Sequence, residues 1–356
     1  MILKKIMAAL KGGRFMVEHG QYWKGMTLLS GFDQVKTYEL FSALPLRQAR
    51  ESGGLSIVPQ SAWATMDKSE KSMFVGHYPI FVNDGRNRVN KYHVKRVLNG
   101  YQYLCELRSQ DGRSASMLQG KHQTLLTHLF DNLPHEFETK SEVPFSSEWF
   151  LELYNAMEEG QVKDTFQDLA RGCGLHAVVK ERALMEPHTD WSWLEYDLKG
   201  LSQAYLTLAI EPEYLKDLAL SSHQTLIIPE MLSEWERAVV SDMVCTTIDM
   251  IQSALYEGES MHHENVTREN YPVFIHLNRY DAFNELGVAA HKAKYSHMAM
   301  FMVAPDLDFL RKNYHSQTLF AAGFKLFDTD FCKKKGAFGF KENGLYPGEM
   351  ETVYLN

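Results

Sequence analysis

Histidine has the most obvious capacity for metal chemistry in this chain, because fifteen of the 356 residues are histidines. His262, His263, His276, His291 and His297 fall close together in the sequence. Two ligands on one helix must lie three or four residues apart to reach the same ion, whereas His291 and His297 are six apart. The zinc sequence His-Glu-x-x-His does not occur. We therefore expect ordinary core or surface histidines, with no metal and no other cofactor.

A second candidate is His188-Thr189-Asp190, which has the His-x-Asp form that supplies two ligands in iron(II) oxygenases. Those enzymes place the motif among many short strands. Here the following sequence, Trp191-Ser192-Trp193-Leu194-Glu195, favours a helix instead. We interpret Thr189 or Asp190 as the N-cap of that helix.

Glycine-containing motifs for nucleophilic catalysis and phosphate binding are incomplete in this sequence. No Gly-x-Ser-x-Gly elbow occurs. The glycine-rich fragments Gly12-Gly13 and Gly172-Cys173-Gly174 lack the Lys-Ser/Thr of a phosphate loop, and we interpret both as turns. We assign no catalytic residue.

Composition describes an ordinary globular protein, with 45% hydrophobic and 23% charged residues, enough for one large or two modest domains. The formal charge of −8 argues against a nucleic-acid partner, which normally meets a basic face. The four cysteines form no Cys-x-x-Cys pair, so neither a zinc knuckle nor a disulfide framework is indicated. We expect a cytoplasmic protein.

Membrane segments are not predicted. The apolar start of the chain ends at residues 11–14, after too few apolar residues for a signal peptide. No run of eighteen apolar residues occurs elsewhere. We expect no membrane span, which leaves peripheral association open.

Apolar residues recur at helical spacing through most of the chain, so we predict a mainly α, multi-helix globular protein with a less regular α+β N-terminal third. Aromatic and β-branched residues around Asn83-Asp84-Gly85 predict a short hairpin or two edge strands. The acidic, apolar-poor segment 134–144 is the predicted linker. It separates a mixed α/β region, 1–133, from a helical domain, 145–323, and an irregular tail, 324–356.

The clearest predicted helix begins after Pro229. Its apolar residues step by three or four and so share one face: Trp235, Val239, Met243, Thr246, Met250 and Ala254. Residues 32–50 predict another helix, which ends before Gly53-Gly54.

The segment 235–297 carries a resemblance to a known family. After the long helix come Val273-Phe274-Ile275-His276-Leu277-Asn278-Arg279 and then Asn284-Glu285-Leu286-Gly287-Val288-Ala289-Ala290-His291. This order resembles the C-terminal soluble domain of the DotM/TrbA family, although the family's glycine before Arg279, its Trp-Leu-Lys-Pro run and its transmembrane helices are absent. The resemblance implies a subunit of a type IV secretion or conjugation coupling complex.

A basic segment is the predicted partner-binding surface. It concentrates five positive charges in an acidic protein, Arg86, Arg88, Lys91, Lys95 and Arg96. An acidic protein partner is one explanation, and pairing with the acidic residues of 134–142 within the same chain is the other. The resemblance adds Arg279 to the surface, where pairing with Glu285 is the structural alternative.

The sequence therefore predicts a non-catalytic adaptor or assembly subunit of a bacterial secretion or conjugation machinery that binds protein partners. The alternative is a helical-bundle enzyme that uses histidines and carboxylates of 188–297, with or without a metal.

Overall fold

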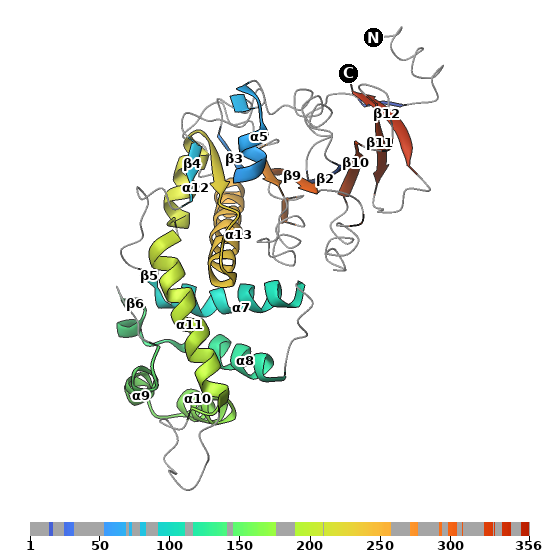
Figure 1. Ribbon diagram of the computed structural model, residues 1–356. Helices are drawn as coiled ribbons and strands as arrows, with labels where there is room; N and C mark the ends of the chain where they lie inside the picture. Colours follow the sequence, from blue (N-terminus) through green and yellow to red (C-terminus); the bar gives the residue numbers. More distant parts are fainter. Residues whose placement is uncertain are drawn as a thin grey trace. The chain divides into compact units, whose positions relative to one another are not determined.

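The computed structural model forms two compact units, and each takes residues from separate parts of the chain (Figure 1). Unit 1 comprises Met1–Val82, Pro212–Glu230 and Cys245–Asn356, and unit 2 comprises Asn83–Glu211 and Met231–Val244. The structure describes residues 14–16, 25–31, 53–68, 71–72, 79–82, 92–110, 117–140, 145–175, 189–208, 210–257, 271–276, 292–293, 298–304, 308, 324–329, 331, 337–342 and 350–355.

Unit 1 is built on a ten-stranded sheet with the order β1-β12-β11-β10-β2-β9-β8-β3-β7-β4. Its strands are β1 (Arg14–Met16), β2 (Gly25–Ser30), β3 (Gly54–Pro59), β4 (Pro79–Phe81), β7 (His223–Ile228), β8 (Tyr271–His276), β9 (Met298–Ala304), β10 (Phe324–Asp328), β11 (Ala337–Glu342) and β12 (Glu351–Leu355). Every neighbouring pair from β10 to β4 is parallel. The strand β11 is antiparallel to both β10 and β12, and β1 is parallel to β12.

The central strands are apolar along their whole length. β9 has the sequence MAMFMVA, and all seven of its residues are buried. β3 is likewise buried throughout. Strands of a parallel sheet that is covered on both faces have such continuous apolar runs, because neither face meets water.

The prediction of a mainly α, multi-helix protein is therefore wrong. A continuous apolar run such as 298–304 lacks the two-residue alternation of a half-exposed strand, so periodicity does not distinguish it from a buried helix. The segment 324–356, expected to be irregular, contributes β10, β11 and β12. The resulting sheet is mixed, with a large parallel part.

Among the described residues of unit 1, the sheet is accompanied by α5 (Gln60–Thr65), α12 (Pro212–Ser221) and the second half of α13 (Glu234–Glu257). α12 packs against β7 and β3. The hydroxyl of Tyr271 on β8 donates a hydrogen bond of 2.8 Å to the carbonyl of Ala219, which ties this helix to the sheet.

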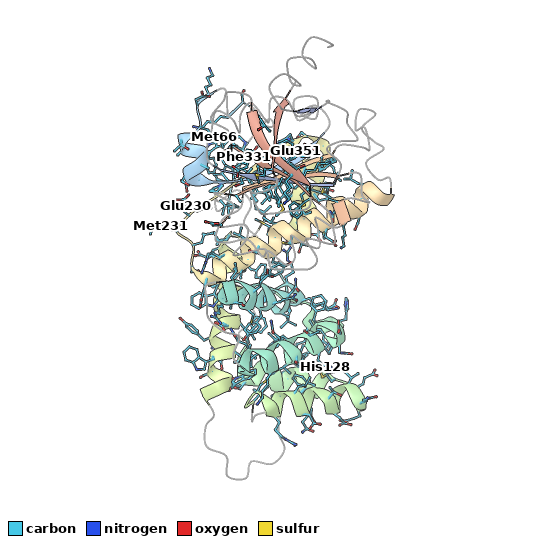
Figure 2. The ribbon with its side chains drawn as sticks, turned by 90° about the vertical axis from the view of Figure 1, so that its right-hand side faces the viewer. Met66, His128, Glu230, Met231, Phe331 and Glu351 are labelled. Carbon is cyan, nitrogen blue, oxygen red and sulfur yellow. The ribbon has the colours of Figure 1, made fainter. Side chains whose placement is uncertain are left out.

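Unit 2 is helical. It contains α7 (Val94–Gln110), α8 (Met117–Asn132), α9 (Ser147–Ala156), α10 (Gln161–Gly172), α11 (Thr189–Leu208) and the first half of α13 (Glu234–Glu257). α7 packs against both α8 and α11, and α8 packs against α10. His128 of α8 (Figure 2) donates through Nε2 to the carbonyl of Val162 at 3.0 Å.

The segment 134–144, predicted to be a linker, falls inside unit 2. It holds a short 3-10 helix, η1 (His135–Phe137), and β6 (Thr139–Lys140), which pairs with β5 (Tyr92–His93). Ser146 caps α9, since its side chain accepts a hydrogen bond from the amide of Trp149; the sequence favours Ser146 or Ser147 as this cap.

The predicted helix after Pro229 is confirmed as α13. Among the described residues, its stretch Glu234–Leu255 is the one helix long and apolar enough to cross a bilayer. Most of it is buried inside the protein, as in the core helix of a globular fold.

Candidate functional site

The connections of the sheet in unit 1 point to one edge as a candidate ligand site. β3, the strand that follows β2 in the sequence, lies on the far side of β9 and β8 in the sheet. β10, the strand that follows β9 in the sequence, lies in the opposite direction, on the far side of β2. β2 and β9 therefore flank a topological switch point, where open α/β sheets bind ligands at the carboxyl ends of their strands.

Hydrogen bonds join the carboxyl ends of the three strands at this point. Gly31, which has a φ of 97°, donates its amide to the carbonyl of Ala304 at 3.1 Å. Thr329 donates both its amide, at 2.9 Å, and its hydroxyl, at 3.1 Å, to the carbonyl of Ser30. The positive φ of Gly31 requires a glycine, because an L side chain is strained there. The end of β2 thus turns sharply between β9 and β10.

A buried carboxylate lies at the same edge. Asp328 pairs with Ser30 in the register of β10 and β2 and is almost fully buried. Its Oδ1 accepts a hydrogen bond from the amide of Phe331 at 3.2 Å. The carboxylate therefore stabilises the turn after β10.

The sequence that follows β2 resembles a phosphate loop in part. Phosphate loops have the sequence Gly-x-x-x-x-Gly-Lys-Ser/Thr between a strand and a helix. Counted from Ser30, the lysine and hydroxyl positions are Lys36 and Thr37, but the two glycine positions are Ser30 and Val35. Glycine pairs do not mark this segment, whereas the Lys-Thr sequence shortly after a strand does. Residues 32–37 lie outside the described residues.

The residues at the two glycine positions determine whether this edge of the sheet can bind phosphate. The backbone amides of a phosphate loop surround the phosphates, which requires glycines that leave space and adopt positive φ. Val35 is β-branched and does neither readily. Lys36 and Thr37 would still supply a cation and a hydroxyl.

The predicted basic surface is only partly within the described residues. Lys95 Nζ lies 3.2 Å from Glu138 Oε1, in the acidic segment proposed as its intramolecular partner. Arg96 binds Asp242, with a distance of 2.8 Å from Nη2 to Oδ2. The other residues of the predicted surface lie outside the described residues: Arg86, Arg88, Lys91 and Arg279. Their role in partner binding stays a prediction.

Asp242 is the centre of a buried network in unit 2. Besides Arg96, it accepts hydrogen bonds from Asn99 at 3.1 Å and from the Tyr205 hydroxyl at 2.5 Å. Burial by itself lowers the pKa of the Arg96 guanidinium, but the charge and hydrogen bond of Asp242, together with the charges of Tyr205 and Glu211, raise that pKa above its usual value. Burial also raises the pKa of Tyr205, so the phenol stays protonated and donates. Each charged group of this network is paired within the protein, so we interpret it as a structural ion pair and not as a catalytic site.

A second network joins three elements of unit 2. Arg108 donates to both carboxylate oxygens of Asp197, at 2.7 and 2.8 Å, and its Nη2 donates to Glu234 at 2.6 Å. The indole of Trp235 donates to Asp197 Oδ1 at 3.1 Å. α7, α11 and the start of α13 are thereby fixed to one another within the unit.

One serine–histidine pair has the distance of a nucleophile and its base. Ser56 Oγ and His223 Nε2 are 2.8 Å apart on the neighbouring strands β3 and β7. Both residues are almost fully buried, at 1% and 2% exposure. A substrate would not reach this serine, so we interpret the pair as a bridge within the core.

The predicted absence of a metal site mostly concerns histidines outside the described residues. The side chains of His188, His262, His276, His291 and His297 lie outside the described residues. Within the described part of the chain, no group of three or more His, Cys, Asp or Glu residues could hold a metal ion.

Comparisons with known proteins give only distant structural likenesses. No family model matches the chain, and no curated protein matches it. The chain is similar to VirB4 of Thermoanaerobacter pseudethanolicus, with 12% identity, a TM-score of 0.47, and coverage of 97% of this chain and 95% of that one.

It is also similar to the bacterial conjugative coupling protein TrwBdeltaN70 in two crystal forms. The trigonal form with sulphate has 10% identity, a TM-score of 0.40, and coverage of 90% of this chain and 75% of that one. The unbound monoclinic form has 11% identity, a TM-score of 0.42, and coverage of 99% and 90%. Likenesses at this level do not establish the function of this chain, and none of them confirms the DotM/TrbA resemblance.

Proposed function

We propose that the protein is a non-catalytic assembly subunit of a bacterial conjugation or secretion apparatus, in which it binds protein partners. We base this on the edge of the sheet after β2. A phosphate-loop nucleotide hydrolase carries Gly-x-x-x-x-Gly-Lys-Ser/Thr after such a strand, yet Ser30 and Val35 stand at the two glycine positions here. The resemblance of 235–297 to coupling-complex subunits supports the type of machinery.

The competing function is nucleotide hydrolysis. The topological switch point between β2 and β9 favours it, as do Lys36 and Thr37 at the spacing of a phosphate loop. In phosphate-loop enzymes the lysine contacts the β- and γ-phosphates, and the hydroxyl binds Mg²⁺. Lys36 is therefore the residue whose replacement distinguishes the two functions.

The experiment compares Lys36→Ala with Lys68→Ala, which replaces an exposed lysine elsewhere in unit 1. Phosphate release from ATP with Mg²⁺ is measured for the purified proteins, and DNA or protein transfer is measured in a deletion strain that carries each variant. We expect Lys36→Ala to release phosphate at the same rate as the unchanged protein. We also expect both variants to restore transfer to the level of the unchanged protein. Hydrolysis and transfer that are lost with Lys36→Ala alone would establish the competing function and overturn ours.

A further inference from the structure

We draw no further inference here: the strongest candidate, the exposed aromatic patch that Trp193 and Tyr196 form on α11 of unit 2, carries none because nothing among the described residues shows what covers it.

Discussion

The indole of Trp235 occupies the space that a side chain at position 200 would need. A β-carbon on Gly200 would lie 2.6 Å from the ring, well inside van der Waals contact. Because Gly200 has no side chain, the start of α13 can pack against α11 at this position. The indole nitrogen of Trp235 then donates a hydrogen bond to Asp197.

Gly200→Ala should consequently destabilise the protein, although alanine is the better helix former. Overpacking at such a contact costs about 1–3 kcal/mol. The free energy of unfolding in denaturant measures the loss, and tryptophan fluorescence reports the displacement of Trp235. Gly120→Ala is the control, since nothing lies within 4 Å of a β-carbon there and the helix α8 should gain up to about 1 kcal/mol. Equal effects of the two substitutions would contradict the close packing of Trp235 on Gly200.

Met243→Ala should destabilise the protein by about 2–4 kcal/mol, because it leaves a cavity in a packed core. Met243 is fully buried on α13, and its sulfur accepts a hydrogen bond from the amide of Ile210 at 3.4 Å. The same substitution at Met231, which is 98% exposed (Figure 2), is the matched control. The measurement is the denaturation midpoint of each variant. A shift for Met243→Ala no larger than that for Met231→Ala would show that the buried face of α13 is assigned wrongly.

Cys105 should resist alkylation in the folded protein. Burial raises the pKa of its thiol to about 12, so little reactive thiolate forms at mildly alkaline pH. Because the pKa of Cys105 is higher in the folded than in the unfolded protein, its contribution to the stability of the folded state is complete below the pKa of an unfolded thiol. It is lost as the pH rises from there towards the folded pKa. Mass spectrometry of the peptide that contains Cys105 follows iodoacetamide labelling against pH, with denatured protein as the control. Labelling at the denatured rate would show that the thiol is accessible.

Reversal of Arg88, Lys91 and Lys95 to glutamate tests the basic surface. Folding should remain nearly intact, because Lys95 is partly exposed and a surface ion pair such as that with Glu138 contributes little to stability. Association with an acidic protein partner should be lost, which a pull-down at several salt concentrations measures. Lys95→Glu alone separates the intramolecular pair from the other two charges. Retained association with an unchanged salt dependence would remove this segment from the interface, and a collapse of stability would show that the charges serve the fold.

Features encoded over a few residues could be predicted from the sequence. Ser146 caps α9 through a hydrogen bond to an amide three residues away, and the spacing of apolar residues after Pro229 predicts α13. Both depend on local geometry that a short window of sequence contains. Lys36 and Thr37 can be read from the sequence as well, but they indicate a phosphate loop only if a strand precedes them. Local sequence patterns did not predict that strand.

The sheet and the switch point were decided by tertiary structure. β2 pairs with β9 although more than half of the chain separates them, and Ser30 lies between Ala304 and Asp328 only because that pairing exists. The contacts of Trp235 with Gly200 and Tyr196 likewise require α11 and α13 to meet. By itself the sequence determined α13, the cap of α9, the charge and the residues available for chemistry. Which of these residues meet depends on hydrogen bonds and packing between distant segments, and no local pattern records those contacts.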